Sequence, residues 1–268
     1  MARYLIKICY DGTAYCGWQK QKNGLAIQEV MENALQIFTC EKTSLIAAGR
    51  TDAGVHSLGQ YAHFDYMGSM KEYQLLLAFN RYLPDDIKVL EIKKVSPALS
   101  ARYQAYERSY RYILAKEKNP FNRNYTGFIP YLTLKLERMQ AAATYLIGKY
   151  DFSSFGRNNP EIPNRMCELK VCDINEQTDY FSFDFVADRF LHNMVRRMVG
   201  TLANISHFNL PPETISDILK KKCPRQNLVI TAPASGLYLM NVKYPDKFLD
   251  ESYLPELQEN NGEISDLP

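Results

Sequence analysis

An aspartate between two glycines is the residue of this chain best suited to chemistry. Asp52 lies in residues 49–56 (GRTDAGVH), between an apolar run at 45–48 and a strand-like run at 60–64. This pattern predicts a tight loop at the rim of a sheet, and loops mounted on rigid strands often carry catalytic groups. Aspartate also favours turns, because its carboxylate accepts hydrogen bonds from nearby backbone N–H groups. Composition and spacing alone leave both roles open for Asp52.

Basic residues elsewhere could hold such a carboxylate. In a predicted helix over 189–205, the residues Arg189, His192 and Arg196 follow i, i+3, i+7 spacing and lie off the apolar stripe. That face either directs an arginine into a cleft or is an ordinary solvated surface. A single carboxylate with arginines suits a nucleophile or an ion-paired catalyst better than an acid/base pair.

Aromatic and basic residues alternate along residues 102–112, which read RYQAYERSYRY. A strand of this kind can bind phosphates through arginine and stack bases on tyrosine. The competing interpretation is a tyrosine face packed across strands. The single tryptophan, Trp18, in the glycine-punctuated loop 11–24, fits either a core position or a ligand contact.

Apolar periodicity predicts two α+β halves with a boundary near Pro97. In the first half, strands are predicted at 4–10, 43–48, 60–66 and 87–95, and helices at 26–39 and 71–83. Their order, β-α-β-β-α-β, is that of a ferredoxin-like or RRM-like unit. The second half repeats it loosely, with strands at 102–114, 168–174, 180–186 and 237–242 and helices at 136–147, 189–205 and 212–221. Sheets of two such units can join edge to edge around a central cleft, so we expect domains over 1–97 and 98–247.

Composition restricts the class of protein. Hydrophobic residues make up 46% and charged residues 23%, which indicates a soluble globular protein. Residues 249–268 hold six acids and no base, so the remaining body has 32 basic against 24 acidic residues. A moderately basic body suits a polyanionic partner, and we expect residues 248–268 to form a loosely ordered acidic tail.

Several classes of site are disfavoured. The six cysteines form no C-x-x-C pair and have no histidine at zinc spacing, which favours reduced thiols in the cytosol over a metal site. P-loop, dinucleotide-binding and nucleophile-elbow motifs are missing from the sequence. No apolar run approaches the ~20 residues of a membrane helix.

Seven motifs follow one another along residues 3–244. They are YDG and GWQ at 10–19, GRTDAGVH at 49–56, FN with LPDDI at 79–87, ARY with RSYRY at 101–112, DFSSF at 151–155, FLHNMVR at 190–196 and TAPA with GL at 231–237. Together they give the chain a strong resemblance to the tRNA pseudouridine synthase A family. The combination is far more specific than any single motif. It favours the catalytic role of Asp52 over the turn.

The resemblance implies a role for each matching residue. Asp52 matches the catalytic aspartate, and Arg196 matches the arginine that pairs with it. Arg50 matches the arginine thought to help draw the target base out, Tyr110 the tyrosine that stacks on that base and can move protons, and Leu237 an apolar residue of the uracil pocket. We extend the predicted substrate contacts to residues of the same motifs: His56, Arg102, Arg108 and His192.

The resemblance further implies isomerisation of uridine to pseudouridine in the anticodon stem-loop of tRNA, at positions 38–40, by a cytoplasmic homodimer that needs no cofactor or metal. Attack on the base, attack on the sugar and a glycal route all stay open for Asp52. The sequence departs from the family pattern at Ser57, at Cys167 in place of a usual arginine, and at 228–229. Cys167 therefore raises the question of a lost RNA or structural contact.

Overall fold

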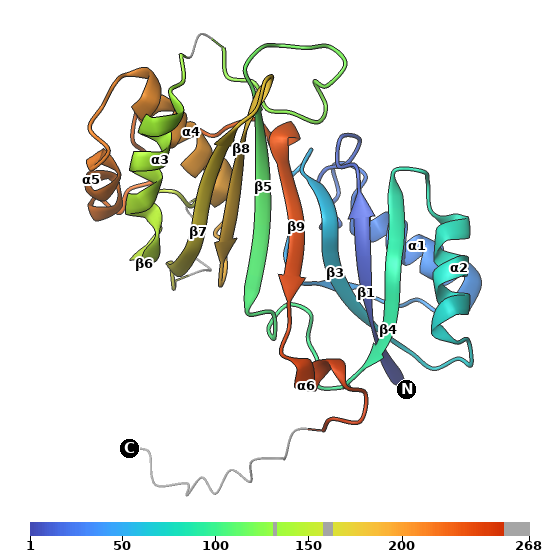
Figure 1. The fold of residues 1–268 in the computed structure, drawn as a ribbon. Helices are drawn as coiled ribbons and strands as arrows, with labels where there is room; N and C mark the ends of the chain where they lie inside the picture. The colour runs from blue at the N-terminus through green and yellow to red at the C-terminus, as the bar shows by residue number, and fades with distance from the viewer. Residues whose placement is uncertain (131–132, 158–162, 255–268) are drawn as a thin grey trace, which may run out of the picture.

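The computed structural model describes residues 1–130, 133–157 and 163–254, and shows one open mixed sheet covered by helices (Figure 1). The strand order is β4-β1-β3-β9-β5-β8-β7-β6, with β2 attached to β3. The first half supplies β1 (Ala2–Tyr10), α1 (Ile27–Thr39), β2 (Ile46–Ala47), β3 (His56–Tyr66), α2 (Glu72–Tyr82) and β4 (Ile87–Val95). The second supplies β5 (Glu107–Ala115), α3 (Leu136–Ala143), β6 (Gly148–Asp151), β7 (Met166–Glu176), β8 (Tyr180–Ala187), α4 (Met194–His207), α5 (Thr214–Lys220), β9 (Leu237–Lys243) and α6 (Asp246–Leu249).

The first half has the predicted β-α-β-β-α-β order. β1 pairs antiparallel with both β3 and β4, and α1 packs on them through Ile27, Met31, Ala34 and Leu35, all buried at helical spacing. Trp18 is also in this core, with 2% of its surface exposed, so the structure supports the core interpretation of that residue.

The two halves join through strands from opposite ends of the chain. β3 pairs in parallel with β9, with His56 opposite Tyr238 and Ser57 opposite Leu239. Farther along β3, its edge pairs instead with β2. β9 in turn pairs antiparallel with β5. The predicted edge-to-edge joining is thus confirmed, and a late strand of the second half lies against the first.

The second half repeats the unit with additions. β9-β5-β8-β7 has the same relative order as the ferredoxin-like unit, and the β7–β8 hairpin is confirmed. An extra strand, β6, pairs with β7 at the far edge and was not predicted. Only four residues long and polar, it gives little periodicity to detect.

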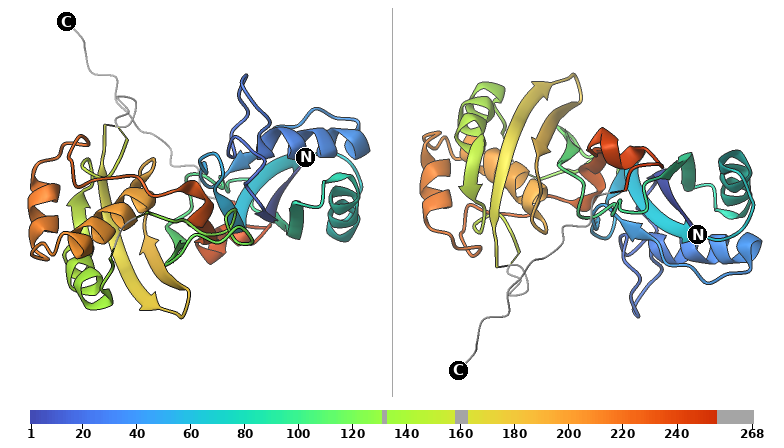
Figure 2. Two further views of the ribbon diagram at one scale, coloured as in Figure 1. Left: turned by 90° about the horizontal axis from the view of Figure 1, so that it is seen from above. Right: turned by 90° about the horizontal axis from the view of Figure 1, so that it is seen from below.

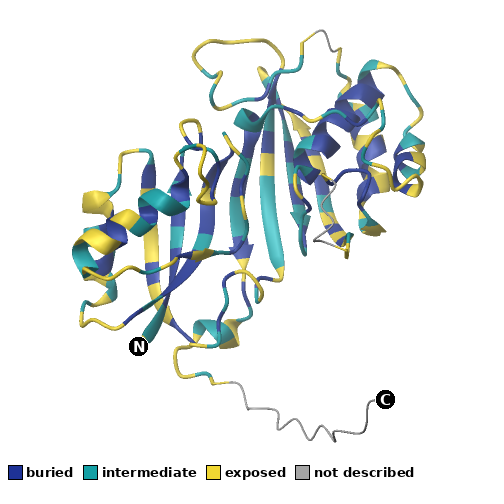
Figure 3. Cartoon of the chain, turned by 180° about the vertical axis from the view of Figure 1, so that it is seen from behind, coloured by how far each residue is buried: buried dark blue, intermediate teal, exposed yellow. Residues whose placement is uncertain are grey.

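Helices α1 and α4 lie behind the sheet in the view of Figure 1, and the end-on views of Figure 2 place them on the same side of the strands. Seen from behind in Figure 3, buried positions alternate along the strands and run along the helices that cover them. One core cluster belongs to each half, and a third cluster at the junction combines Leu5 and Ala48 with Leu239, Val242 and Tyr244. No helix in the described part of the chain is long and apolar enough to cross a membrane.

Two predicted strands are shortened. The strand predicted at 43–48 is reduced to β2. Side chains of α1 take both backbone groups of Leu45: its N–H donates to the Glu32 carboxylate at 3.0 Å, and its carbonyl accepts the Gln28 amide at 3.1 Å. The strand predicted at 102–114 begins only at Glu107. Before it, the Ser100 carbonyl accepts hydrogen bonds from the N–H groups of Tyr103 and Gln104, which close a turn.

Part of the predicted tail contacts the first half. The Ser96 hydroxyl donates to the Tyr253 carbonyl at 2.6 Å, and Lys94 pairs with Glu251 at 2.9 Å. The Ser96 N–H also donates to the carbonyl of Phe248 in α6. Residues 255–268 lie outside the described part of the chain, so the loosely ordered tail stays a prediction. The division at Pro97, between β4 and β5, stays a proposal.

Arg108, at the start of β5, ties together backbone from both halves. Its Nη1 donates to the carbonyls of Ala105 and Asp188 at 2.6 and 2.7 Å. Its Nη2 donates to the carbonyls of Arg102 and Ala48 at 3.1 and 3.3 Å. Since these donors are used within the protein, a structural role is favoured over the predicted RNA contact.

Arg108→Met should lower the free energy of unfolding by about 3 kcal/mol, because it leaves partly buried carbonyls without their charged donor. Denaturant titration measures the change. Arg111→Met on the same strand is the matched control: Arg111 pairs with Asp184 in a pair whose arginine side chain is 46% exposed, and such a pair contributes under about 1 kcal/mol. Equal losses for the two variants would contradict this role.

Candidate active site

The loop that carries Asp52 is held from beneath by the first half. The hydroxyl groups of Tyr10 and Thr51 are hydrogen-bonded at 2.8 Å, and the Gln60 side-chain amide donates to the Gly49 carbonyl at 2.9 Å. The Thr51 carbonyl accepts the Trp18 N–H at 3.1 Å. These contacts fix the backbone that leads into Asp52.

Gly17 explains how the loop 11–24 comes so close. Its φ is +89°, and a Cβ there would lie 2.4 Å from the Thr51 carbonyl oxygen. Only glycine accepts this backbone conformation and this approach. The two glycine-containing loops of the sequence are therefore packed directly on each other.

Both carboxylate oxygens of Asp52 have cationic or imidazole partners from the second half. Arg196 Nη1 donates to Oδ2 at 3.0 Å, and His192 Nε2 lies 3.0 Å from Oδ1. The side chains of Asp52 and Arg196 are 20% and 17% exposed, while that of His192 is 43% exposed. The predicted pairing of Asp52 with Arg196 is present, and His192 joins it.

The helix carrying Arg196 begins later than predicted. α4 starts at Met194, so residues 189–193 are not helical, and Arg189 does not share a helix face with the other two. Asn193 has φ +64°, a left-handed conformation that asparagine tolerates better than other non-glycine residues. The resulting turn, rather than helical spacing, brings His192 and Arg196 to the same carboxylate.

The Arg196 guanidinium is fixed by further bonds. Its Nε donates to the Ala232 carbonyl at 2.8 Å, and its Nη1 also donates to the side-chain oxygen of Asn193 at 3.1 Å. The Ala232 N–H donates back to the Arg196 carbonyl at 3.1 Å. Arg196 is therefore positioned before any substrate arrives.

These partners set the ionisation of Asp52. Burial alone would raise the pKa of the carboxyl, but the hydrogen bond and charge of His192, together with Arg196, outweigh it and hold the pKa below its usual value of 3.8. Asp52 is therefore a carboxylate at neutral pH.

Tyr110 lies on β5, with its ring packed edge-on against Phe190 at 5.1 Å between centroids. Burial, and next the neighbouring Tyr10, raise the pKa of its hydroxyl, with a further contribution from the Asp52 charge. Tyr110 therefore stays a neutral phenol at physiological pH.

The remaining predicted substrate contacts are placed differently. Arg50 is exposed beside Asp52 but does not contact it, and Leu237 begins β9 at 6% exposure in the core cluster of the second half. Arg102 is exposed and lies over the ring of its neighbour Tyr103, with 5.5 Å from Cζ to the centroid. Substrate contacts by these three residues stay predictions.

His56 is buried, with 2% of its surface exposed, and lies in β3 rather than in the loop before it. Its Nδ1 accepts the Gly12 N–H at 3.1 Å, so the proton is on Nε2, 2.8 Å from the Asn124 carbonyl. Because Nδ1 then carries no proton, its 3.1 Å approach to Asp11 Oδ1 is not an ion pair. The ring also stacks on Tyr238 at 4.8 Å. These contacts favour a structural role over the predicted substrate contact.

Cys167 is 1% exposed within the core of the second half. Burial raises the pKa of its thiol to about 12. A side chain in this position does not reach bound RNA directly. The departure at this position therefore bears on packing.

Sequence reasoning missed Thr51, Asn193 and Ala232 as positioning groups, although each lies in a motif that it identified. Asn193 stands immediately before the helix, and a left-handed N-terminal residue gives no periodic signal. The role of Ala232 is carried by its backbone carbonyl, which no side-chain pattern encodes.

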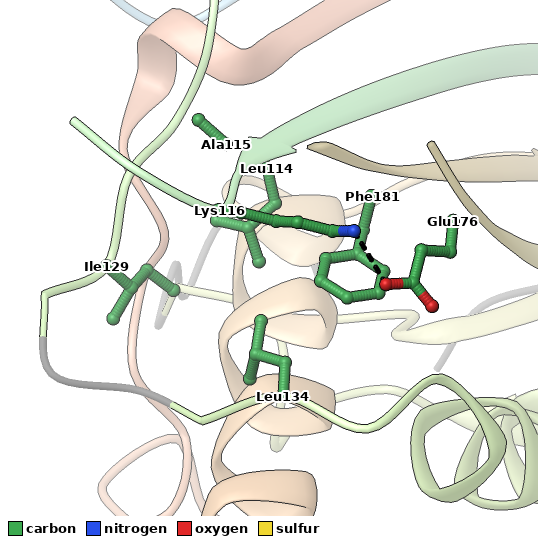
Figure 4. Close-up of a pocket in the computed structure, with 7 residues that line it drawn as sticks. All are labelled: Leu114, Ala115, Lys116, Ile129, Leu134, Glu176 and Phe181. Carbon is green, nitrogen blue, oxygen red and sulfur yellow. Dashed lines mark ion pairs between the residues drawn. The ribbon is translucent and has the colours of Figure 1, made fainter. Parts of the chain in front are cut away.

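Two surface cavities border β5, and neither includes Asp52. One is lined by Leu114 and Phe181 together with the Lys116–Glu176 ion pair at 2.6 Å (Figure 4). The other is lined by polar residues of β5, β7 and β8. The predicted central cleft therefore stays a prediction. Within the described ranges, no three His, Cys, Asp or Glu side chains are grouped to hold a metal ion.

The fold and the site define an α+β protein with a mixed sheet and a single ion-paired carboxylate where its two halves meet. A family profile described as tRNA pseudouridine synthase matches residues 7–104 and 142–245. The chain belongs to the tRNA pseudouridine synthase family.

Curated relatives agree over nearly the whole chain. The chain is 40% identical over 246 residues to tRNA pseudouridine synthase A of Thermoanaerobacter pseudethanolicus, covering 91% of this chain and 100% of the relative. It is 38% identical over 250 residues to the protein of that name from Bacteroides fragilis, covering 92% and 98%. The corresponding protein of Colwellia psychrerythraea is 36% identical over 255 residues, covering 92% and 95%.

Proposed function

We propose that this protein converts uridine to pseudouridine in the anticodon stem-loop of tRNA, at positions 38–40. The observation that carries the proposal is the Asp52 carboxylate held by Arg196 and His192, within the motifs and fold of a pseudouridine synthase. Family membership supports the reaction and the RNA substrate. The geometry supports the residues assigned to it.

The chemistry fits an ionised carboxylate. Pseudouridine formation breaks the C–N glycosidic bond and joins the same sugar carbon to C5 of the base. A carboxylate attacks covalently or stabilises a cationic sugar intermediate, and the lowered pKa of Asp52 keeps it ready for either role. Because no atom or electron is exchanged with a second reagent, we propose that the reaction needs no cofactor.

The target base must leave the stem before it reacts. Extruding a stacked base costs a few kcal/mol. Arg50, which is exposed two residues before Asp52, is proposed to fill the vacated stack. Tyr110 and Leu237 are proposed to contact the extruded uracil through the aromatic ring and the apolar side chain.

We further propose that the protein acts in the cytoplasm as a homodimer, with one tRNA in contact with both subunits. Two copies of the basic body would extend the surface that meets phosphates. The size of the complex formed with tRNA, measured by light scattering, tests this arrangement. A complex containing one protein chain would contradict it.

Binding should depend chiefly on phosphate contacts, given the excess of basic residues outside residues 249–268. If the protein contacts 6–10 phosphates, raising the salt concentration from 50 to 200 mM should weaken its binding to tRNA by roughly 10³- to 10⁵-fold. Equilibrium binding of tRNA across this salt range checks the prediction. A flat response would show that backbone contacts contribute little.

The proposed function is tested with purified protein and an unmodified tRNA transcript. Conversion of uridines in the anticodon arm supports it. Tight binding without conversion would instead indicate an RNA-binding or chaperone protein.

A further inference from the structure

The two side chains that contact Asp52 have different chemical capacities. Arg196 stays protonated at all physiological pH values, so it can hold a carboxylate but cannot carry a proton. An imidazole can both accept and release a proton near neutral pH. His192 therefore offers the site something that the Asp52–Arg196 pair lacks.

The reaction needs such a group, and this step rests on the proposed function. After C5 of the turned base has bonded to the sugar, C5 still carries its hydrogen and N1 lacks one. Completing pseudouridine requires loss of the C5 proton and protonation of N1. A base must stand close to Asp52, because the sugar carbon bonded to C5 is the one on which Asp52 acts.

The neighbouring groups are poorly suited to accept that proton. Asp52 has a lowered pKa, which makes its carboxylate a weak base. Tyr110 has a raised pKa, because its hydroxyl is buried near other phenol and carboxylate groups. A neutral phenol accepts a proton poorly, and little phenolate exists at neutral pH.

The geometry of His192 suits the task. His192 Nε2 lies 3.0 Å from Asp52 Oδ1, and in the tautomer with the proton on Nε2 the other ring nitrogen, Nδ1, carries a lone pair. Nδ1 has no hydrogen-bond partner among residues 1–130, 133–157 and 163–254. The side chain is 43% exposed, so substrate and water can reach the ring. A carboxylate that orients an imidazole in this way also stabilises the imidazolium form.

The backbone next to His192 is held in place. The His192 carbonyl accepts the N–H of Arg157 at 2.9 Å, and Asn193 turns the chain directly after it. The backbone on the carboxyl side of His192 is thus fixed although its side chain is accessible.

We propose that His192 is the proton carrier of the reaction. Its Nδ1 takes the proton from C5, and the electrons of the C5–H bond restore the C5=C6 double bond. The electrons of the C6=N1 bond move to N1, which takes a proton from water. The exposed imidazolium then returns its proton to water, so the net change is one proton lost at C5 and one gained at N1.

The test compares His192→Gln with the unaltered protein in single turnovers on tRNA whose target uridines carry protium or deuterium at C5. Glutamine keeps a hydrogen-bond donor for Asp52 but cannot act as a base. We expect the rate to fall on the order of 10²-fold, with a deuterium isotope effect larger than that of the unaltered protein, because loss of the C5 proton becomes limiting. His192→Ala should regain rate when free imidazole is added.

His207→Gln is the matched control. His207 lies at the last position of α4, where its Nδ1 accepts the Thr133 N–H at 3.2 Å, and it does not contact Asp52. Its rate and isotope effect should match those of the unaltered protein. Binding of tRNA, measured for every variant, confirms that each is folded.

Two results would overturn the proposal. One is an unaltered rate for His192→Gln. The other is a slow His192→Gln variant with no increase in isotope effect, together with no rescue of His192→Ala by imidazole. That second result would leave His192 as a residue that only positions Asp52. If the unaltered protein forms no pseudouridine, the proposed function itself fails and this role falls with it. Normal conversion by the unaltered protein alongside either result isolates the failure to His192.

Discussion

Asp52→Ala is expected to abolish release of the uracil 5-hydrogen, with a rate loss on the order of 10⁴-fold or more. The carboxylate supplies the negative charge that can attack the sugar or the base, or offset a developing positive charge there. Tritium release from tRNA labelled at uracil C5 measures the effect. Binding of tRNA should be nearly unchanged, because one side chain contributes little to a surface of phosphate contacts.

Asp52→Asn sharpens this result, because the amide nearly preserves the size of the side chain and removes its charge. Asp184→Asn is the matched control: Asp184 pairs with Arg111 at 2.7 Å on the exposed side of the second half, so its loss should leave the rate unchanged. Turnover retained by both Asp52 variants would show that the carboxylate is not catalytic.

Arg196→Met should reduce turnover by roughly 10²- to 10³-fold, the size typical for loss of a preorganised charge in an active site. Burial then acts on Asp52 with one fewer opposing charge, so the pKa of Asp52 rises. In the unaltered protein the pKa is depressed, so the stabilisation from ionised Asp52 is present above pH 3.8 and is lost as pH falls through the folded pKa. In Arg196→Met, activity should therefore be lost at a higher pH than in the unaltered protein.

Arg196→Lys separates charge from geometry. Lysine keeps a cation near Asp52 but loses the guanidinium bonds to the Ala232 carbonyl and Asn193. We expect an activity between those of the unaltered protein and Arg196→Met. In a plot of activity against pH, Arg196→Lys should lose activity at nearly the same low pH as the unaltered protein. If Arg196→Met also lost activity at that pH, Arg196 would not control the ionisation of Asp52.

The helices and strands that could be predicted are those in which buried apolar residues recur at helical spacing or at every second position. α1 was predicted within one residue, and the β7–β8 hairpin follows the alternation of Phe181, Phe183 and Phe185. The errors arise where contacts distant in sequence decide. β2 is short because Gln28 and Glu32 of α1, 17 and 13 residues earlier, take the backbone groups of Leu45, and local propensity carries no information about those partners.

The sequence identified most residues of the site but not the contacts that they make. The motif resemblance identified Asp52 and Arg196, which lie 144 positions apart. His192 was expected to contact substrate, yet it contacts Asp52 because the chain turns at Asn193 before α4 begins. Arg108 was expected to bind RNA, yet four backbone carbonyls accept its hydrogen bonds. Amino-acid type shows what a side chain can do, and the topology decides which partner it meets.

The most direct test of the central claim is to map pseudouridine in tRNA from cells with and without this protein, and from cells lacking it that carry either the unaltered gene or Asp52→Asn. The account predicts that pseudouridine at positions 38–40 of the anticodon arm disappears without the protein. It predicts return with the unaltered gene and continued absence with Asp52→Asn. An unchanged pseudouridine map without the protein, or full restoration by Asp52→Asn, would contradict it.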